Sequence, residues 1–540
     1  MSMTLAGEEF DYIVIGAGSA GAVVANRLSE DAGVTVALLE AGPKDRNILF
    51  RVPLFHPYLY TDARFNWMFE GEPEEGLNGR RSYQPRGRVL GGTSSINAMI
   101  YIRGQKADYD GWAEAGCRGW SYEDVLPYFR KAENNEVLHD RFHGNDGPFH
   151  VQYPAYETAL TRAGLQAYQE FGIPANSDFN GAQQEGAGRY QMSTRKGVRQ
   201  NTSQAYLKPV RHRRNLSVKT EHAVRRVLIE NGRAVGVEVD VGGQTRAIRA
   251  RRCVVVSAGA FHSPTILQLS GIGPSQLLAD RGVPLVNDLP GVGQNLQDHF
   301  WCTVMMECAQ KLTMNDIINS PVRKLLTALN YALRRRGPLT SCGSVVGAFT
   351  RTDDGQDRPN LQIHMGSWGL KGRTIKGVEP YPFPAFTFSP VHLNPVARGT
   401  VAIRSGDYRD APLMKFNYLG DDVDLTAMRN AIQIARSLAR QPALKPFFVR
   451  ELSPGPDVQS DDEVNDFIRQ NGMPNLHPAG TCRMGEDEGA VVDSRLRVRG
   501  IKGLRVADAS IMPRVIRGNT SAPTVMIGEK AADMIRQDYR

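Results

Sequence analysis

The sequence predicts two domains, an α/β domain around a parallel sheet and an α+β domain around an antiparallel sheet. The chain has 540 residues, more than the roughly 100 to 200 residues of a typical single domain. Its N-terminal part contains an apolar run, a glycine-rich turn, a helical stretch and a second apolar run, the order found in parallel α/β units. Between about residues 300 and 475, short strand-like pieces alternate with Pro- and Gly-rich loops, which is typical of antiparallel sheets.

The first predicted elements surround a glycine turn. The apolar run 12–15 predicts a buried strand, the small residues after the turn predict a helix to about Ser29, and the run 34–39 predicts a second strand that ends at Glu40. Residues 16–21, GAGSAG, place glycines where the first strand turns into the helix. This order predicts a Rossmann-like unit.

Three later segments are predicted to complete the parallel-sheet domain. Residues 252–257 (RCVVVS) form a continuous apolar run, as expected of a central parallel strand that is buried on both faces. Residues 504–507 predict another short buried strand, and residues 522–535 predict a helix that opens on Pro523. The two ends of the chain are therefore expected to share one domain.

The second domain is predicted from strand-like pieces at 359–365, 385–389 and 399–403. Two long polar segments rich in Pro and Gly, 70–87 and 366–384, are expected to be excursions or lids, because long structureless loops are usually functional or mobile. The two domains are predicted to alternate along the chain. The parallel-sheet domain is assigned residues 8–150, 216–300 and 476–540, and the antiparallel-sheet domain is assigned residues 151–215 and 301–475.

The composition argues against several classes of protein. Hydrophobic residues make up 41% and charged residues 23% of the chain, as in ordinary globular proteins. The net charge of +8 is spread along the chain without a long basic block, so nucleic-acid binding is not expected. The six cysteines include no CxxC pair, which argues against a zinc cluster or a disulfide framework, and the histidine spacing suggests no metal site.

The expected location is the cytoplasm. Scattered cysteines fit a reducing compartment, and the N-terminus shows neither the basic region nor the cleavage site of a signal peptide. No apolar run reaches the roughly 18 residues that suggest a spanning helix. Short arginine clusters such as 334–336 fall below the size of a typical lipid-binding patch, but a peripheral contact with the inner membrane face stays open.

The glycine turn predicts a binding site for a dinucleotide. Gly16 allows the tight turn, Gly18 lets a pyrophosphate approach the backbone, and Gly21 permits close helix packing, while the helix N-terminus offers amide donors. Glu40, about 20 residues further on, can accept hydrogen bonds from both ribose hydroxyls and would repel a 2′-phosphate. The motif by itself is compatible with FAD and with NAD.

Two longer stretches separate these alternatives. Residues 87–97 (GRVLGGTSSIN) resemble the first signature of the glucose-methanol-choline (GMC) flavoprotein oxidoreductases, and residues 259–273 resemble the second. The similarity covers nearly the whole chain and includes 295–299 (NLQDH) and 477–485 (HPAGTCRMG). Near the C-terminus, the stretches RVADASIMP and IGEKAADMI are similar to the branch of choline, L-sorbose and aliphatic alcohol dehydrogenases.

The resemblance implies an FAD-binding parallel-sheet domain and a substrate-binding antiparallel-sheet domain. It places the ADP part of FAD over the glycine turn and the isoalloxazine against 91–98 and 508–524, where small and hydroxyl residues are also typical of turns. Ile96 stands where some members attach FAD to a histidine, so FAD is expected to be non-covalent. The cofactor-binding residues that this implies are Gly16, Gly18, Ser19, Ala20, Gly21, Glu40, Ala41, Arg88, Gly91, Gly92, Ser95, Asn97, Ala98, Val224, Ala258, Asp508, Ala509, Asn519, Thr520 and Thr524.

The resemblance also implies two catalytic residues in the last segment of the chain. His477 is the histidine of the family motif that faces the flavin, and an imidazole can accept a proton near neutral pH. Asn519 stands where the family has a second histidine or an asparagine, and it is expected to hydrogen-bond the substrate oxygen. Cys482, in the same motif as His477, is expected to be a packed and unreactive thiol.

The predicted activity is oxidation of an alcohol, a primary alcohol or a polyol, to an aldehyde or ketone. A proton is expected to go to His477 and a hydride to FAD, with the electrons passed to a quinone or another acceptor other than NAD. The alternatives are a choline dehydrogenase, an oxidase that uses O2, and a hydroxynitrile lyase that keeps FAD without redox chemistry. An NAD enzyme would be colourless when purified.

Overall fold

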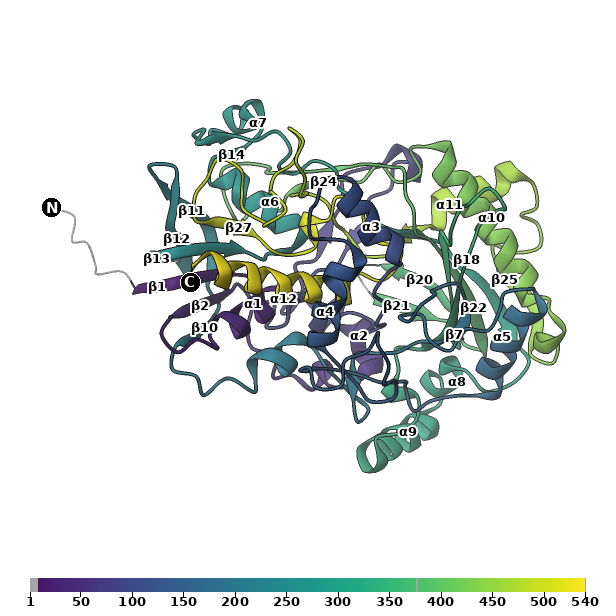
Figure 1. Ribbon diagram of the computed structural model, residues 1–540. Coiled ribbons are helices and arrows are strands. Elements are labelled where there is room, and N and C mark those ends of the chain that lie inside the picture. Colours follow the sequence, from purple (N-terminus) through teal and green to yellow (C-terminus); the bar gives the residue numbers. More distant parts are fainter. Residues whose placement is uncertain (1–7, 375–376, 540) are drawn as a thin grey trace.

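The computed structural model describes residues 8–374 and 377–539. Two sheets organise the chain (Figure 1). The parallel-sheet domain contains both ends of the described chain, and the antiparallel-sheet domain lies beside it. Of the helices in the described ranges, none is long and apolar enough to cross a membrane.

The first sheet has seven strands, with β10, β2, β1, β13, β12 and β11 side by side and β27 paired to β13. The pairs that join β10, β2, β1, β13 and β27 are parallel, whereas β11 and β12 form an antiparallel extension. The central strands read as continuous apolar runs because both faces of the sheet are covered. The strand bounds are β1 Glu8–Ile15, β2 Val36–Glu40, β10 Leu216–Thr220, β11 Ala223–Glu230, β12 Arg233–Val241, β13 Gln244–Val256 and β27 Leu504–Val506.

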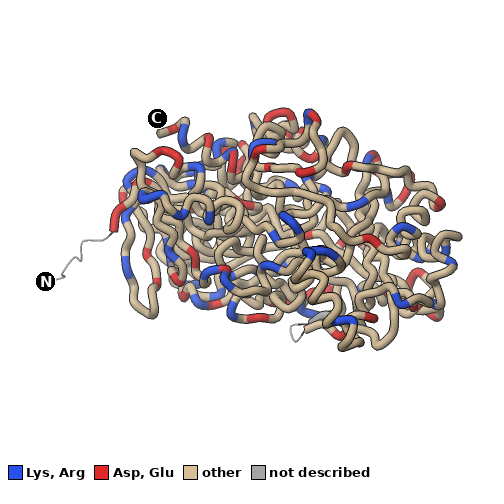
Figure 2. Tube along the Cα trace, turned by 90° about the horizontal axis from the view of Figure 1, so that it is seen from below, with Lys and Arg blue, Asp and Glu red and all other residues tan. Residues whose placement is uncertain are grey.

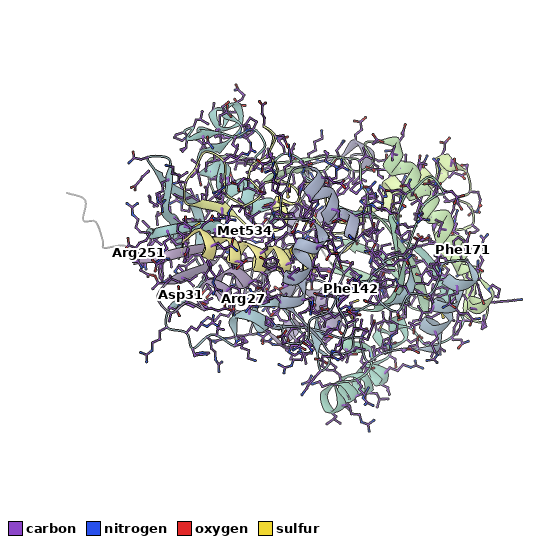
Figure 3. The ribbon with its side chains drawn as sticks, viewed as in Figure 1. Arg27, Asp31, Phe142, Phe171, Arg251 and Met534 are labelled. Carbon is purple, nitrogen blue, oxygen red and sulfur yellow. The ribbon has the colours of Figure 1, made fainter. Side chains whose placement is uncertain are left out.

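The expectation that the two ends share this domain is confirmed. Helix α12 (Ser521–Asp538) packs against α1 (Gly21–Leu28), and the pair covers the sheet. The Arg27 guanidinium on α1 donates to both carboxylate oxygens of the buried Glu529 on α12 at 2.8 Å. Figure 3 labels Arg27 and Met534 on these two helices.

The second sheet has eight strands and is antiparallel throughout. Strands β25, β17, β22, β19, β18 and β7 lie side by side, and β16 joins β22 to β26. Helices α10 (Asp422–Ala439) and α5 (Ala159–Glu170) pack on it around a second hydrophobic core. The strand bounds are β7 Gly186–Arg189, β16 Phe300–Trp301, β17 Val304–Cys308, β18 Ser344–Thr350, β19 Leu361–Gly366, β22 Ala385–His392, β25 Phe448–Ser453 and β26 Met473–Pro474.

The fold class is therefore as the sequence predicts, and each sheet draws its strands from the segments assigned to it, with β16 beginning at the predicted boundary. The boundaries themselves stay a prediction.

The other helices are α2 His56–Leu59, α3 Lys106–Glu114, α4 Tyr122–Ala132, α6 Gly259–Leu269, α7 Ser275–Asp280, α8 Met314–Ile318, α9 Pro321–Arg334 and α11 Asp461–Asn471. Short strand pairs are β3 Phe69–Glu70 with β4 Tyr83–Gln84, β5 Glu133–Asn135 with β6 Phe149–Val151, β8 Thr194–Arg195 with β9 Val198–Arg199, and β14 Ile272–Gly273 with β15 Asn287–Asp288.

The structure describes the two expected excursions and one predicted strand in more detail. The segment 366–384 is not structureless, because it contains a hairpin of β20 (Leu370–Thr374) and β21 (Gly377–Pro380). The segment 70–87 is held to the body of the protein, since the Glu74 carboxylate accepts the backbone N–H groups of residues 416 and 417. The predicted strand 399–403 pairs with β24 (Leu413–Lys415) as β23 (Thr400–Ala402), outside the large sheet.

Candidate active site

A cavity of about 1160 Å³ runs from the glycine turn to the antiparallel sheet. Its floor is the carboxyl edge of β1 and β2, the edge where ligands bind in open parallel sheets. Most of the predicted cofactor residues line it, namely Gly16, Gly18, Ser19, Ala20, Glu40, Ala41, Arg88, Gly92, Asn97, Ala98, Val224, Ala258, Asp508, Ala509, Asn519, Thr520 and Thr524, and so does His477.

The glycine turn has the geometry that the motif predicts. Gly16 ends β1 with a φ of +92°, a conformation that side-chain-bearing residues rarely adopt. A Cβ atom on Gly21 would lie 1.9 Å from the carbonyl oxygen of Gly16, so only glycine lets α1 start this close to the strand. Gly21 allows this close packing and does not line the cavity, so a direct contact with the cofactor stays a prediction.

Glu40 lies at the end of β2 with its carboxylate at the cavity wall. Its oxygens accept the backbone N–H groups of Ala17 at 3.0 Å and Gly42 at 2.9 Å. Burial raises the pKa of this carboxyl to about 7. A carboxylate has about four lone-pair sites, so it has acceptor capacity left beside these amide donors, and the hydroxyl donors of a ribose would fit here.

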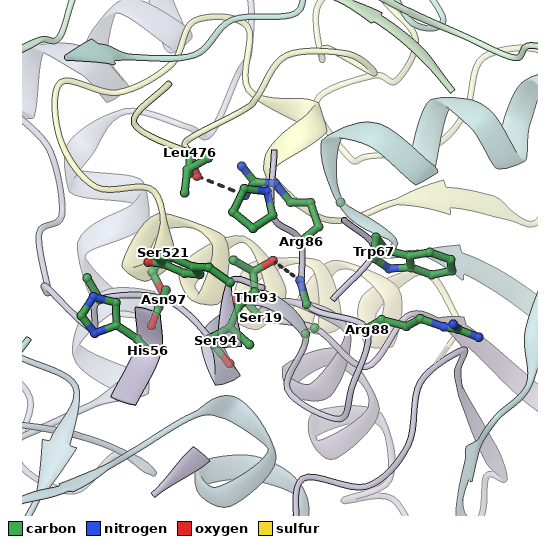
Figure 4. A pocket seen from close by; sticks show the side chains of 18 of the residues that line it. Ser19, His56, Trp67, Arg86, Arg88, Thr93, Ser94, Asn97, Leu476 and Ser521 are labelled. Carbon is green, nitrogen blue, oxygen red and sulfur yellow. Dashed lines mark hydrogen bonds between the residues drawn. The ribbon is translucent and has the colours of Figure 1, made fainter. Parts of the chain in front are cut away.

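The segment 91–98 forms a tight turn whose residues divide into two sets. Gly92, Asn97 and Ala98 face the cavity. Gly91 and Ser95 lie behind it, because the Ser95 hydroxyl donates to the Leu90 carbonyl oxygen at 2.7 Å. Neither residue lines the cavity, so their role as direct cofactor contacts stays a prediction, and both shape the turn. Figure 4 shows Ser19, Ser94, Asn97 and Ser521 on this side of the cavity.

Asp508 ties together two loops at the bottom of the cavity. Its carboxylate accepts the Gly259 N–H at 2.8 Å, the Ser263 hydroxyl at 2.5 Å and the Ser510 N–H at 2.8 Å. It caps the short helix 509–511 as a helix-capping aspartate would. Asp508 lines the cavity while holding the turn after β13 in place.

His477 is held from three sides. Its backbone N–H donates to the Asp298 carboxylate at 2.6 Å, its Nδ1 lies 3.0 Å from Nδ1 of His299, and its Nε2 lies 3.2 Å from Nδ2 of Asn519. Asn475 Nδ2 also lies 3.3 Å from Nδ1. The structure therefore brings the two predicted catalytic residues into direct contact, although 42 positions separate them in the chain.

The surroundings keep the histidines neutral. Burial, together with the positive charge that His299 and Arg86 would place nearby, lowers the pKa of His477 well below its ordinary value. Burial lowers the pKa of His299 to about 3, and it raises the pKa of Asp298 to about 6. An imidazole that is neutral at physiological pH can accept a proton, so His477 has the state that a general base needs.

Asn519 has a fixed orientation. Its Oδ1 accepts from Nε2 of Gln362 at 3.2 Å, which directs its Nδ2 toward His477. Thr520 directly precedes the N-terminus of α12, where free backbone N–H groups and the helix dipole favour negative charge. The Thr524 hydroxyl donates to the Thr520 carbonyl oxygen at 2.7 Å, and the Thr524 backbone N–H donates to the same oxygen at 3.1 Å, so this residue closes the first turn of α12.

Several cavity residues were not selected from the sequence. Arg86 donates to the Leu476 carbonyl oxygen at 3.1 Å (Figure 4), and Trp67, Trp301, Trp368, His262 and His364 also line the walls. They come from loops and strands that the fold brings together, so no local spacing could have indicated them. Cys482 is fully buried, and burial raises the pKa of its thiol well above the ordinary range, as expected of an unreactive cysteine.

One cluster with metal-ligand chemistry lies outside the cavity. Asp140, His143 and Asp178 place one potential ligand atom each within 4.8 Å of one another. His143 uses both ring nitrogens within the protein, with Nδ1 3.2 Å from Glu133 and Nε2 2.9 Å from Asp178. These ion pairs raise the pKa of His143 to about 9, which favours a structural imidazolium over a metal ligand.

The comparisons with known proteins agree with this geometry. Models of the GMC oxidoreductase family match residues 10–301 and 395–528. The oxygen-dependent choline dehydrogenase of Pseudomonas syringae pv. tomato is 43% identical over 538 residues, covering 98% of this chain and 94% of the relative. The mitochondrial choline dehydrogenase of Homo sapiens is 41% identical, covering 98% and 90%.

A solved structure of the same fold is pyridoxine 4-oxidase from Mesorbium loti. It superposes with a TM-score of 0.88 at 31% identity and covers 98% of this chain and 99% of the other. The family binds FAD, and the glycine turn, Glu40 and the long cavity fit that cofactor. The chain belongs to the GMC oxidoreductases, the FAD-dependent enzymes that oxidise CH–OH groups.

Proposed function

We propose that the enzyme oxidises a neutral, apolar primary alcohol. The observation that carries this proposal is the chemistry of the cavity beyond His477. Among the described residues that line the cavity, the carboxylates are Glu40, Asp240 and Asp508, and all three belong to the parallel-sheet domain. The antiparallel-sheet end instead presents two tryptophans, Trp301 and Trp368, with Met305, Met314 and Leu370.

A quaternary ammonium such as choline is the alternative that the relatives' names suggest. Aromatic side chains can bind such a cation, but the faces of Trp67 already meet other groups. The Arg88 guanidinium lies 5.0 Å from its ring centroid, and the His262 ring lies 4.4 Å from it. Arg86 and Lys324 also line the cavity. Without a carboxylate at this end, a cationic substrate meets like charges, which disfavours it.

The proposed base is Nε2 of His477. The hydrogen-bond network places the amide N–H of Asn519 against Nε2, which leaves Nε2 as an acceptor and assigns the ring proton to Nδ1, shared with His299. A substrate hydroxyl that replaces Asn519 at Nε2 can donate to this nitrogen, while its oxygen accepts from the displaced amide N–H. Proton removal and stabilisation of the oxygen then occur at one point. Bound FAD supplies the hydride acceptor for the carbon-bound hydrogen.

We infer non-covalent binding of FAD from Ile96. This side chain is buried in a small apolar cluster and has no nucleophile. The residues that would hold FAD are those of the glycine turn with Glu40 at one end and Asn97, Asp508 and the α12 N-terminus at the other. The electron acceptor is proposed to be a quinone or O2 rather than NAD.

Anaerobic titration tests this function. The purified yellow protein is mixed with benzyl alcohol, 1-hexanol, glycerol and choline, and the oxidised flavin band is followed in wild type and His477→Ala. The expected result is bleaching by the apolar alcohols that slows strongly in the variant. Faster bleaching by choline than by any neutral alcohol would overturn the substrate proposal. Aldehyde release from a cyanohydrin, without bleaching by any alcohol, would indicate the lyase. The rates at which air and a soluble quinone re-oxidise the reduced flavin are then compared, and the faster oxidant indicates the acceptor.

A further inference from the structure

Helix α9 (Pro321–Arg334) projects from the body of the protein together with α8 (Figure 1). It carries an unusual number of exposed apolar side chains. Val322 is 67% exposed, Leu325 60%, Leu326 59%, Leu329 47% and Leu333 80%. Soluble surfaces rarely expose a contiguous apolar patch of this kind unless it contacts another molecule or a membrane.

These five residues, here called the leucine face, occupy one side of the helix. Their spacing of three and four residues places them along a single stripe. Tyr331 lies on the opposite side, where it is buried and its hydroxyl donates to the Gly197 carbonyl oxygen at 3.1 Å. Thr327, which is half-buried, also faces the protein and lines the cavity. The leucine face is therefore directed away from the body of the protein.

Positive charge surrounds the leucine face. The sequence has no Asp or Glu from residue 317 to residue 352. The hairpin of β8 and β9, which contacts α9 through Gly197, adds exposed basic side chains. Figure 2 views the molecule from the side toward which α9 projects and marks such positions in blue. The basic residues of this surface are Arg195, Lys196, Arg323, Lys324, Arg334, Arg335 and Arg336.

These cations lack acidic partners. Within residues 8–374 and 377–539, no carboxylate forms an ion pair with any of the seven. Seven unpaired basic residues around an apolar stripe match the composition of helices that lie in the surface of an anionic membrane. A helix of 14 residues is about 21 Å long, too short to span a bilayer but sufficient to lie in its surface.

The cavity opens beside the same helix. Lys324, Thr327 and Ala328 of α9 and Ile317 and Ile318 of α8 are among its lining residues. Tyr58 on α2 is another, and this side chain is 62% exposed. Aromatic residues of this kind favour the membrane interface. The mouth of the cavity and the leucine face thus share one side of the molecule.

We propose that α9 docks this enzyme on the surface of an anionic lipid bilayer, with the leucine face inserted between the lipids and the basic residues at the head groups. The charge around the stripe distinguishes this occupant from a second copy of the chain, whose α9 surface would bring like charges together. If the proposed function also holds, an apolar alcohol or a quinone dissolved in the bilayer reaches the cavity through a mouth that faces the lipid.

Vesicle flotation with the full-length flavin-loaded protein tests the docking. Vesicles of phosphatidylcholine alone are compared with vesicles that also contain phosphatidylglycerol. Wild type is expected to float with the anionic vesicles only and to be released by high salt. Leu325→Ser/Leu329→Ser is expected to lower the partition coefficient at least about tenfold, because several buried methylenes are lost. Arg334→Gln/Arg335→Gln/Arg336→Gln is expected to remove the preference for anionic lipid.

The matched control is Leu285→Ser/Val286→Ser. These side chains are 53% and 48% exposed and follow α7, on the opposite side of the molecule in Figure 1. This variant should float like wild type, and all variants should keep their flavin spectrum and their rate with a water-soluble alcohol. In a second readout, the fluorescence of Leu329→Trp should shift to shorter wavelength on anionic vesicles.

Three results would overturn the docking, and none of them bears on the alcohol oxidation itself. The first is failure of wild type to bind either kind of vesicle. The second is binding that the α9 substitutions leave unchanged. The third is a wild-type dimer in sedimentation that Leu325→Ser/Leu329→Ser converts to a monomer without any vesicle binding, since this would assign the leucine face to a second copy.

Discussion

The Nδ1 atoms of His299 and His477 lie 3.0 Å apart, so one ring must donate a proton to the other. Asn519 already donates toward Nε2 of His477, and this assigns the shared proton to Nδ1 of His477. His299 is fully buried. The contact fixes both the orientation and the tautomer of the proposed base, much as a carboxylate does for the histidine of other catalytic groups.

Removal of the base should slow the chemical step. His477→Ala is expected to lower the rate of anaerobic flavin reduction by an alcohol about 10²- to 10⁴-fold, the usual contribution of a general base. The FAD content should stay close to wild type, because the predicted cofactor contacts lie on other segments. Stopped-flow absorbance measures the rate. Asn475, whose Nδ2 lies 3.3 Å from Nδ1 of His477, provides the comparison, because Asn475→Ala should lower the rate less. An unchanged rate in His477→Ala would contradict the assignment.

The pH profile should reflect the lowered pKa of His477. Because burial disfavours the imidazolium, the base stays neutral below its ordinary pKa of 6.5. The value of kcat/KM is therefore expected to remain level from about pH 8 to below pH 6.5 and to fall only at lower pH. Steady-state rates in buffers of constant ionic strength test this. A midpoint at or above 6.5 would show that the site does not hold His477 neutral.

His299 should make the protein sensitive to acid. Its folded-state pKa of about 3 lies below its ordinary value of 6.5. The unfolded chain thus binds this proton more readily, and the free energy of unfolding decreases as pH falls from 6.5 toward 3. His299→Gln is expected to weaken this pH dependence of Tm and, as a positioning change, to alter the pH profile of kcat/KM. A Tm profile parallel to that of wild type would argue against a buried neutral His299.

Glu40 should make cofactor binding and stability depend on pH in opposite directions. Its pKa of about 7 lies above the ordinary 4.5, so folding of the FAD-free protein favours the protonated form. The free energy of unfolding of the apoprotein should fall by about 3 kcal/mol as pH rises from 4.5 to above 7. FAD affinity should rise over the upper part of this range, since the carboxylate accepts ribose hydroxyls.

Glu40→Gln separates these effects. The variant should lose the pH dependence of both FAD affinity and stability, and it should bind FAD more weakly at pH 8. Fluorescence titration of the apoprotein measures the FAD affinity, and chemical denaturation measures the free energy of unfolding. Met305→Leu, a change at the antiparallel-sheet end of the cavity, provides the control. An FAD affinity in Glu40→Gln equal to that of wild type at every pH would remove Glu40 from the cofactor site.

Asn519 should act on the transition state more than on binding. Asn519→Ala is expected to lower kcat about 10²-fold, the loss typical of one donor to a developing oxyanion, with a smaller change in KM. Gln362→Ala, which frees the orientation of Asn519 without removing its N–H, should cost less. Equal losses in the two variants would show that Asn519 is only a structural link between His477 and Gln362.

Local patterns predicted a large part of the site. The glycine turn and Glu40 at the end of β2 belong to one strand–helix–strand unit, and their roles follow from backbone sterics and from the helix N-terminus. The same reasoning could not separate Gly92, which faces the cavity, from Gly91 and Ser95, which lie behind it. The side of a tight turn that meets a ligand depends on how the turn is seated against the rest of the fold.

By itself the sequence determined the fold class, the dinucleotide site, the family and His477 with Asn519 as a pair of interest, because each leaves a signal within a few neighbouring residues. Only the tertiary structure decided that His299 contacts His477, that the substrate end of the cavity presents tryptophans without a carboxylate, and that the leucine face of α9 points outward. The first two features join residues that are distant along the chain. The third depends on the absence of other described segments packed against this face of α9. Their energies come from contacts and burial that form when the chain folds.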